Sequence, residues 1–422
     1  MKVSELSENL KPSAILQLAA DIRALIAEGH QIYNLTIGDF NPKIFQIPDE
    51  LKDEIIRAYE SDNTNYPPGN GEVLLRKNIS EYLKNNLGTD YSENEIMISG
   101  GARPLLYAAY QTLLDIGDTV LYPAPSWNND AFTYLARNKA VILRTKAENR
   151  FLPMAEEIEP HIRDIHLISL CSPLNPTGTS FGKEELEKIC DLILIENKRR
   201  NELAVKPLYL IYDQIYWQLS YGDTAHYHPV LLRPEMKDFT LSVDGISKCF
   251  AATGVRVGWA FGPKKIIGKM VSLLTHVGAW SPKAEQIAVG NYLTHTENVK
   301  SYMENIKSEL SFRLNEFYKE FMQLKAEGFP VDAIQPEAAL YLTLKFDLIG
   351  KESAKGQKIN TVQDITNYLL HEAKVALVPF SSFGASSDSV WYRLSVGTTA
   401  RNDIPNIMNN LKNALESMRV TV

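Results

Sequence analysis

Cysteine is scarce in this chain: its 422 residues include only Cys171, Cys190 and Cys249. None of them lies in a C-x-x-C spacing and the count is odd, so the sequence predicts neither a disulfide framework nor a cysteine zinc site. Such sparse use of cysteine is typical of a reducing compartment. We therefore expect a cytoplasmic protein.

Long apolar runs and clustered positive charge are also missing. No segment approaches the roughly 18 apolar residues of a membrane span, and Glu5 and Glu8 stand where a secretory signal would need an apolar stretch. The net charge is −7, whereas a nucleic-acid-binding domain normally presents a clustered basic face. We expect neither a membrane nor a nucleic acid as a partner.

Histidine offers no evident metal site. The one close pair, His226 and His228, falls in a stretch that we expect to form a polar loop, and the pair lacks a third ligand. We expect no bound metal.

A chain of this length exceeds one compact core, so two domains are expected. Apolar residues recur at helical spacing over 14–28, and a short strand with a Gly-Asp turn follows at 31–39. Between about 49 and 295, helical patterns alternate with β-rich runs, which predicts an α/β fold with a mostly parallel central sheet flanked by helices on both faces. The runs are EIMIS (95–99), TVLYP (119–123), HLISL (166–170), LYLIYD (208–213), FTLSV (239–243) and VRVGWAF (255–261).

The rest of the chain predicts a smaller α+β domain. A long helical pattern at about 297–325 precedes the runs ALYLTLKF (339–346), VALVPF (375–380) and WYRLSVG (391–397), and a last helix is expected at about 402–417. We expect residues 49–300 to form the large domain, 301–422 the small domain, and 1–48 a segment that joins the small one. No Pro/Gly linker separates these parts, so they should share a broad interface.

In sheets of this kind, ligands bind where strands end and loops begin. In the segment SVDGISKCFAATGVRVGWAFG (242–262), Lys248 follows one β-run, and Arg256 lies eight residues later, just before the next β-run. A single lysine is most often a surface charge. A Ser-Lys pair followed by Thr-Gly-x-Arg-x-Gly, however, resembles the cofactor-lysine motif of class I/II aminotransferases, the fold type I pyridoxal-5′-phosphate (PLP) enzymes.

This resemblance implies that Lys248 carries PLP as a Schiff base and that Ser247 beside it is a further cofactor contact. A lysine in this role must be neutral when it attacks, and burial near other cations lowers its pKa. Arg256 is implied to bind the cofactor phosphate, because a guanidinium matches phosphate oxygens in bidentate fashion. The alternative for Arg256 is a structural salt bridge.

Upstream, ISGGARPLLYAAYQTLL (98–114) predicts a strand, a glycine turn and a helix. Backbone N–H groups at the start of such a helix, at Gly101 and Ala102, can bind an anion. Turns of this kind are often only structural caps, but the resemblance implies a phosphate-binding cup. Arg103 and Pro104 stand where the family usually has Gln or Glu followed by Ala.

Two further loops extend the resemblance. Trp127, in LYPAPSWNNDAF, occupies the position of the aromatic residue that stacks on the cofactor ring, a core tryptophan being the alternative. SLCSPLNPTGTSF resembles the family's Asn-Pro-x-Asn-Pro-Thr-Gly loop, with Cys171 where Asn is usual. Asn175 is thereby implied to donate to the 3′ oxygen of the cofactor and to lie in the substrate site. Asn-Pro-Thr-Gly alone is simply a good turn.

The strand within YLIYDQIYW ends on Asp213, and Tyr216 follows three residues later. The resemblance implies that Asp213 pairs with the protonated pyridine nitrogen and keeps the ring an electron sink. Tyr216 is implied to hydrogen-bond the 3′ oxygen beside Asn175. The family usually has Asp-Glu-x-Tyr here, so Gln214 is a departure that leaves the acid and the tyrosine in place.

Two motifs concern the substrate and the subunit boundary. Arg393, in WYRLSVG, resembles the arginine that binds the substrate's α-carboxylate, assisted by the backbone amide of Gly38; an edge-strand salt bridge is the alternative. NYPPGNGEVLLRKNI resembles the family segment in which a tyrosine reaches the phosphate of the neighbouring subunit. Tyr66 therefore implies a homodimer with shared active sites.

The resemblance runs from residue 11 to residue 397 and keeps the family's order of motifs. It implies an aminotransferase with the PLP-dependent transferase fold, which moves the α-amino group of an amino acid to a 2-oxo acid by a ping-pong mechanism through an internal aldimine on Lys248, with Lys248 as general base. A PLP-dependent β-lyase is the alternative enzyme, because it uses the same groups. A PLP-binding regulator would need a DNA-binding module before residue 50, and the intact Lys248, Asp213 and Arg393 argue against an inactive homologue.

The substrate side chain is harder to predict. In aspartate-specific bacterial members, the position of Ala102 is a lysine that pairs with the second carboxylate of the substrate. Ala102 has no charge, and an unpaired carboxylate would keep its desolvation cost, so we expect neutral or aromatic amino acids to outrank aspartate. Trp280 could add apolar surface near the substrate. The alternative is that Arg103 turns inward and replaces the lysine.

Overall fold

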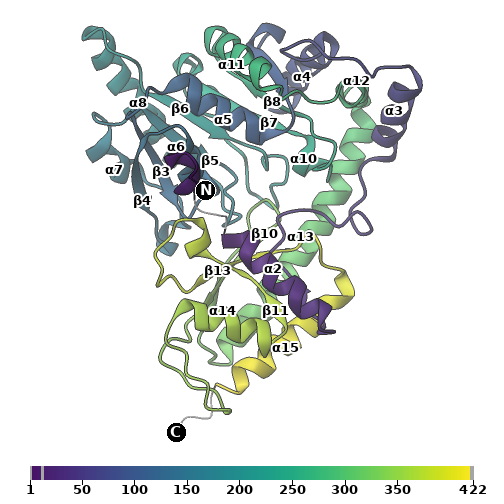
Figure 1. Ribbon diagram of the computed structural model, residues 1–422, viewed down its shortest axis with the longest axis vertical. Coiled ribbons are helices and arrows are strands. Elements are labelled where there is room, and N and C mark those ends of the chain that lie inside the picture. Colours follow the sequence, from purple (N-terminus) through teal and green to yellow (C-terminus); the bar gives the residue numbers. More distant parts are fainter. Residues whose placement is uncertain (1, 11–13, 419–422) are drawn as a thin grey trace.

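The computed structural model describes residues 2–10 and 14–418, so residues 11–13, where the family resemblance begins, lie outside the described residues. A broad upper part is built on a seven-stranded sheet and a narrower lower part on smaller sheets (Figure 1). The long helix α13 (Thr296–Ala326) extends from one part toward the other.

The large sheet has the strand order β2-β8-β7-β6-β5-β3-β4. Strand β8 is antiparallel to both of its neighbours, and the remaining pairs are parallel. Its strands are β2 (Ile96–Ser99), β3 (Thr119–Ala124), β4 (Lys139–Arg144), β5 (Leu167–Cys171), β6 (Tyr209–Asp213), β7 (Thr240–Gly245) and β8 (Gly258–Phe261). The predicted, mostly parallel sheet is confirmed, and β4 is an edge strand that the sequence analysis missed.

Helices cover both faces of this sheet because its strands are apolar on both sides. Ile96 and Ile98 pack into one core, whereas Met97 between them packs into the core on the opposite face. One face carries α5 (Ala102–Leu113), α6 (Asn129–Leu135) and α11 (Lys264–Val277). The other carries α3 (Asp49–Glu60), α4 (Val73–Asn86), α7 (Ala155–Ile158), α8 (Lys183–Glu202), α10 (Ile246–Cys249) and α12 (Lys283–Tyr292). The α/β fold expected from the sequence is therefore confirmed.

The lower part contains a four-stranded antiparallel sheet of order β12-β13-β10-β9 and a two-stranded parallel sheet, β1-β11. Its strands are β1 (Tyr33–Asn34), β9 (Val331–Ile334), β10 (Tyr341–Phe346), β11 (Val375–Ala376), β12 (Val378–Pro379) and β13 (Trp391–Ser395), and its helices besides α13 are α2 (Ala14–Ala27), α14 (Val362–His371) and α15 (Ile404–Glu416). Its core includes Leu35, Phe40 and Phe45 from the N-terminal segment, together with Ile215 and Tyr216 from the loop after β6. The loop that follows β6 is thus packed between the two parts.

His226 and His228 lie in a loop, as expected, and this loop includes the exposed Asp223. Their rings nevertheless pack inward: His228 is 0% exposed and shares a 2.9 Å hydrogen bond between its Nε2 and Ser242 Oγ. Burial lowers the pKa of both imidazoles to about 3, so both are neutral. Among the described residues, no helix has the length and apolar character of a membrane span.

Candidate active site

Lys248 lies at the carboxyl end of β7, in the four-residue helix α10. Its Nζ donates to the carbonyl oxygen of Gly38 at 2.6 Å and lies 6.0 Å from the centre of the Tyr216 ring. Ser247, the neighbouring residue, is buried at 8% exposure. The N-terminal segment and the β7–α10 connection therefore meet at the lysine amine.

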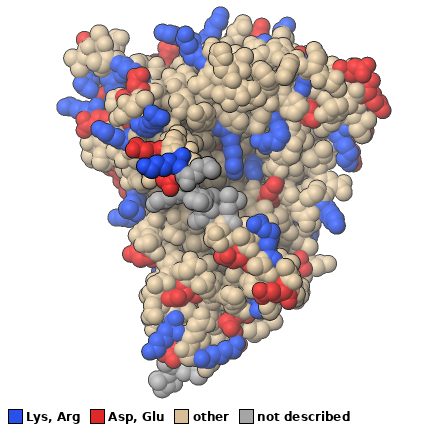
Figure 2. All heavy atoms as spheres, in the orientation of Figure 1, with Lys and Arg blue, Asp and Glu red and all other residues tan. Residues whose placement is uncertain are grey.

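The surroundings of Lys248 favour its neutral form. Burial, the largest cause, lowers the pKa of the amine to about 8, while the nearby Asp39 carboxylate acts in the opposite direction. Three cations lower it further: Arg393, Arg103 and Arg256. Lysine and arginine side chains are visible in the hollow between the upper and lower parts (Figure 2). The site is therefore cationic, and its amine is neutral in a large fraction of molecules near pH 8.

Asp213 ends β6, one strand away from Lys248. Its Oδ1 accepts a hydrogen bond from the backbone N–H of Ile215 at 3.1 Å. Burial raises the pKa of this carboxyl to about 6, and the charge of Lys248 partly offsets that rise. Within the described part of the chain, Oδ2 of Asp213 has no protein donor, so one oxygen is available to a cationic ligand atom.

Tyr216 forms a phenol pair with Tyr341 of β10. The two hydroxyl oxygens are 2.7 Å apart, and both side chains are buried. Burial, followed by the neighbouring Tyr341, raises the pKa of the Tyr216 phenol well above its usual value. Tyr216 therefore stays protonated and can donate to a ligand oxygen.

Arg393 projects from β13 and is 3% exposed. Its Nη1 donates to Asn175 Oδ1 at 3.0 Å and its Nη2 to the carbonyl oxygen of Thr36 at 2.5 Å, whereas Nε is buried without a partner among the described residues. The guanidinium also lies 4.7 Å from the Tyr341 ring centre. A buried arginine with an unused donor fits a carboxylate ligand.

Gly38 lies against this arginine. A Cβ at Gly38 would be 2.8 Å from the Tyr341 hydroxyl and 3.5 Å from Arg393 Nη1. A side chain at this position would therefore collide with the Tyr341 hydroxyl and press against the arginine. In this structure Gly38 contributes its carbonyl to Lys248; its amide was the group expected from sequence.

The predicted cup forms where β2 ends and α5 begins. Gly101 has a φ of 94° and precedes Ala102, the first residue of α5. Arg256 donates to the carbonyl oxygens of Gly100 and Thr253, both at 2.6 Å, and a Cβ at Gly101 would collide with its Nη2. The arginine is thus held directly against the helix N-terminus, and the two together can hold an anion.

Trp127 is partly buried in the loop after β3, and the Arg103 guanidinium lies 4.6 Å from its ring centre. Burial and then the charge of Arg256 lower the pKa of Arg103, while Tyr216 acts in the opposite direction. These interactions place Arg103 near the cup and the phenol. Arg103 is exposed, but its guanidinium lies over the Trp127 ring and its charge acts on Lys248, so it borders the site.

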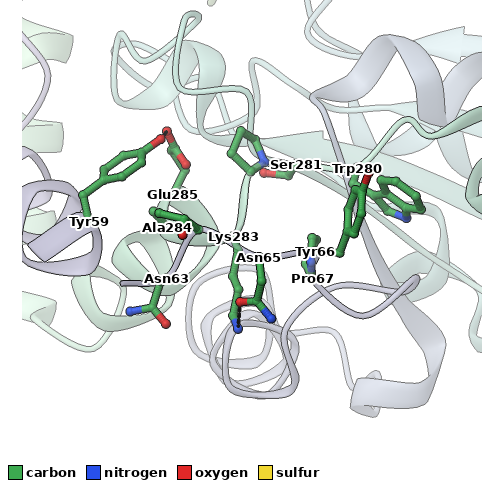
Figure 3. Close-up of a pocket in the computed structure, with 12 residues that line it drawn as sticks. Tyr59, Asn63, Asn65, Tyr66, Pro67, Trp280, Ser281, Lys283, Ala284 and Glu285 are labelled. Atoms are coloured by element: carbon green, nitrogen blue, oxygen red, sulfur yellow. Dashed lines mark hydrogen bonds between the residues drawn. The ribbon is translucent and has the colours of Figure 1, made fainter. Parts of the chain in front are cut away.

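Tyr66 lies apart from the group around Lys248. Its side chain is 79% exposed and packs edge-on against Trp280, with ring centres 5.1 Å apart. Both line a pocket of about 550 Å³ between the segment after α3 and the start of α12, where Lys283 donates to Asn65 Oδ1 at 2.8 Å (Figure 3). The pocket adjoins the cup, because Gly100 N–H donates to the carbonyl oxygen of Ala279 at 3.1 Å.

The sequence analysis did not identify Asp39 or Tyr341. Asp39 accepts a hydrogen bond from Thr253 Oγ1 at 2.6 Å and acts on the charge of Lys248. Its only sequence signal is its place in the Gly-Asp turn. Tyr341 lies inside an ordinary apolar strand and carries no signal at all.

These residues fit pyridoxal phosphate. The helix N-terminus with Arg256 offers a place for a phosphate, and the Oδ2 atom of Asp213 can accept a hydrogen bond from a protonated ring nitrogen. The Lys248 amine, whose lowered pKa favours its neutral form, can form a bond to a carbonyl carbon. Arg393, with its unpaired Nε, can hold a substrate carboxylate.

Comparison with known proteins agrees with this chemistry. Residues 30–409 match the family model for aminotransferase class I and II. The chain is 32% identical to the aspartate aminotransferase of Geobacillus stearothermophilus, over 94% of this chain and 95% of that protein. It is 29% identical to the aspartate aminotransferase of Bacillus subtilis (strain 168), over 94% of this chain and 95% of that protein.

Solved structures give the same answer. The aspartate aminotransferase from Rhizobium meliloti matches with a TM-score of 0.87 at 26% identity, over 99% of this chain and 100% of that one. The Thermus thermophilus aspartate aminotransferase with maleate matches with a TM-score of 0.85 at 27% identity, over 98% of this chain and 100% of that one. The expected aminotransferase is thereby confirmed, and the β-lyase alternative is not favoured. The chain belongs to the aminotransferase class I and II family and is a pyridoxal-phosphate-dependent transaminase.

Proposed function

We propose that Lys248 is the residue that binds the cofactor covalently and then moves a proton at the substrate Cα. The observation that carries this role is the partly buried amine, bound to the Gly38 carbonyl, whose pKa is lowered by desolvation to about 8. A neutral amine can attack a carbonyl carbon and can afterwards accept the Cα proton. When bound, pyridoxal phosphate supplies an electron sink for the charge left at Cα.

The cofactor is held by groups on three sides. Gly101, Ala102, Ser247 and Arg256 bind its phosphate, Trp127 packs against its ring, and Asp213 accepts a hydrogen bond from its ring nitrogen. Asn175 and Tyr216 donate to its 3′ oxygen. Asp213 is the electronic group among them, because a carboxylate at the ring nitrogen keeps that nitrogen protonated.

Arg393 binds the substrate α-carboxylate, with Asn175 and Gly38 as neighbours in the substrate site. The guanidinium is already oriented by Asn175 and Thr36, so little rotational freedom is lost when a carboxylate binds. This fixed carboxylate orients the Cα–H bond toward Lys248, which is the positional part of the catalysis.

We further propose dicarboxylic amino and 2-oxo acids as the preferred substrates. The sequence alone favoured neutral or aromatic amino acids, because Ala102 is uncharged. The Arg103 guanidinium, exposed over Trp127 at the border of the site, supports the alternative, since it offers a cation for a second carboxylate. Relatives named aspartate aminotransferases, one of them solved with maleate, support the same choice.

A homodimer with shared sites is part of the proposal. Tyr66 is highly exposed beside the cup, and in a dimer it would serve the phosphate of the neighbouring subunit. We also propose a cytoplasmic location, a large domain of residues 49–300, and a small domain of residues 301–422 joined by residues 1–48. The contribution of Leu35, Phe40 and Phe45 to the lower core supports this division.

The test is transfer of nitrogen. With a ¹⁵N-labelled amino acid and an unlabelled 2-oxo acid, wild-type protein should produce the second amino acid carrying ¹⁵N, and initial rates should give the parallel double-reciprocal plots of a ping-pong reaction. Lys248→Ala should lose both the transfer and the visible absorption band of the bound cofactor while keeping its circular dichroism. Transfer by Lys248→Ala at the wild-type rate would refute the role of this lysine.

A further inference from the structure

Asp244 is a fully buried carboxylate that has no part in the roles given above. It lies in β7, near Lys248, and is 0% exposed. Its hydrogen-bond donors are two neutral groups, the Trp217 indole Nε1 at 2.8 Å and the backbone N–H of Gly245 at 2.7 Å. An acid buried without a cation costs stability, so its presence beside an active site calls for a functional reason.

The two donors belong to the two chain segments that carry the reactive groups. Trp217 directly follows Tyr216, in the segment that leaves β6 at Asp213. Gly245 directly precedes α10, the short helix of Lys248. One oxygen of Asp244 therefore joins the first segment to β7, and the other accepts from the next backbone amide, where β7 passes into the helix of Lys248.

Tight packing leaves this connection little freedom. Gly245 pairs with Gly258 of β8, and a Cβ at Gly245 would lie 2.8 Å from the Gly258 Cα. The Trp217 indole is 9% exposed and packs against the His226 ring, with ring centres 5.8 Å apart. Because the surroundings are close-packed, a change at the carboxylate is transmitted to both segments.

Among the described residues, the titratable groups that act on the Asp244 carboxyl include no cation. Asp213 from β6 repels its charge, and with burial, the larger cause, raises the pKa of Asp244 to about 7. Cys249 from α10 and Tyr82 from α4 have pKa values well above their usual range, because of burial and of the Asp244 charge, and stay neutral. Burial keeps His226 neutral as well. Any charge on Asp244 therefore acts on the site without a neutralising partner.

Gln214 occupies a second position from which a carboxylate could supply the negative charge of Asp244. It follows Asp213 directly and is 0% exposed. Its amide lowers the pKa of the Asp244 carboxyl, although neither amide atom forms a hydrogen bond of standard geometry. Glutamate is usual at this position in the family motif, so β7 supplies an acid that the loop after β6 lacks.

We propose that Asp244 is a positioning residue of the transamination site, which fixes the Asp213 segment against the Lys248 helix and supplies a negative charge behind Asp213. The inference rests on the roles proposed for Lys248 and Asp213. A negative charge favours the protonated form of the nitrogen that joins Lys248 to the cofactor. Removing the charge should therefore lower the pH at which the visible absorption band of the holoenzyme changes.

Asp244→Asn removes the charge and keeps the size of the side chain. We expect the absorption midpoint of the holoenzyme to move down by about half a pH unit or more, kcat to fall about tenfold or more, and KM for the amino acid to stay within about twofold. Asp238→Asn, at an exposed aspartate just before β7, is the matched control and should keep wild-type values. A folded Asp244→Asn enzyme with wild-type midpoint and kcat would overturn the proposal.

Two further variants separate charge from hydrogen bonding, and they remain informative where Asp244→Asn alone fails to fold. The double variant Gln214→Glu with Asp244→Asn moves the carboxylate to the adjacent loop, so its midpoint should return toward the wild-type value. Trp217→Phe keeps the charge and loses the indole donor, so it should share the fall in kcat and keep the midpoint.

Each variant can also contradict the idea. A double variant that folds with its midpoint still displaced excludes the charge effect, and a Trp217→Phe enzyme with wild-type kcat excludes the positioning effect. The underlying role of Lys248 is tested separately, because its failure would appear as an absorption band retained in Lys248→Ala.

Discussion

Arg393 Nη1 donates to Asn175 Oδ1 at 3.0 Å and thereby joins strand β13 of the lower part to the loop that follows β5 of the large sheet. The Nη2 atom of the same guanidinium donates to the carbonyl oxygen of Thr36, in the N-terminal segment. One buried side chain thus brings three distant stretches of the chain to the place where the substrate carboxylate is proposed to bind. A change that frees this guanidinium should therefore weaken substrate binding more than cofactor binding.

Arg393→Lys tests that relationship. Lysine keeps the charge but loses the planar fork, so it cannot bind Asn175, Thr36 and a carboxylate together. We expect kcat/KM for amino acid donors to fall about a hundredfold or more, mostly through KM, with cofactor retention unchanged. Steady-state kinetics and the absorbance of the dialysed enzyme measure both quantities. Loss of the cofactor in parallel with KM would contradict a role confined to the substrate.

The pKa of Lys248 should respond in opposite directions to two neighbours. Asp39 raises that pKa and Arg103 lowers it, around a value of about 8 that is set mainly by burial. The rate at which cofactor-free protein captures pyridoxal phosphate should rise with pH through this value, because only the neutral amine attacks. Asp39→Asn should move the midpoint to lower pH and Arg103→Gln to higher pH. Stopped-flow absorbance between pH 6 and 10 gives the midpoints, and shifts of the same sign would contradict the assignment.

Much of the fold was predictable because its signals are local. Strands β5, β6 and β7 are short apolar runs between helical patterns, so they were found with bounds correct to within a residue or two. Strand β4 was missed because it is an edge strand whose residues are mostly exposed, and its apolar stretch is flanked by charged residues. An edge strand is defined by its neighbour in the sheet, which no local pattern reveals.

The site was predictable only where a linear motif carries it. Lys248, Arg256, Asp213 and Asn175 lie in such motifs, whereas Tyr341 reaches the site through pairing of β10 with β13. The direction of the Arg103 guanidinium depends on packing against Trp127, which sequence cannot supply. Long-range packing likewise buries the His228 ring within a loop that the sequence predicts to be polar.

Asp213 should affect stability as well as rate. Its pKa is raised to about 6, mainly by burial, so below about pH 4 the carboxyl is neutral in both states, and above about pH 6 its buried charge destabilises the folded cofactor-free protein. Asp213→Asn removes that cost. We expect the cofactor-free variant to be about 1–3 kcal/mol more stable than wild type at pH 8 and no more stable at pH 4, in urea unfolding. The same variant should transaminate about a hundredfold more slowly or worse.

A result of the opposite kind would show a structural acid. If Asp213→Asn is less stable than wild type at pH 8, the protein's own contacts stabilise the charge of the wild-type Asp213 carboxylate without the cofactor. Transamination retained by the same variant would show that the ring nitrogen does not depend on this carboxylate.

Mixed dimers test the shared site. Chains with Lys248→Ala combined with chains with Tyr66→Phe should form hybrids in which one site carries both defects and the other neither. We expect one of the two sites in each hybrid to be fully active, so the hybrid should show about half of the wild-type kcat per dimer. If Tyr66 serves its own subunit, each site of the hybrid carries one defect and none is restored. Differently tagged chains, purified as hybrids, allow that comparison.

The choice of substrate depends on Arg103, the residue whose orientation the sequence left open. Its guanidinium lies over Trp127, close enough to Arg256 for the two positive charges to repel each other. A further carboxylate beside Arg103 would reduce this repulsion. A dicarboxylic substrate supplies that carboxylate, whereas phenylalanine or methionine does not.

We therefore expect aspartate or glutamate to have the highest kcat/KM in wild type. Arg103→Gln should lower this kcat/KM about tenfold to a hundredfold and change the value for phenylalanine by about threefold or less. The loss should fall mainly on KM, because the second carboxylate is bound equally in the ground state and the transition state. Lys77→Gln, an exposed cation on the outer turn of α4, is a control for the loss of one positive charge. If phenylalanine leads in wild type and Arg103→Gln leaves aspartate unaffected, the uncharged Ala102 decides the specificity, and Arg103 serves only the cofactor phosphate beside Arg256.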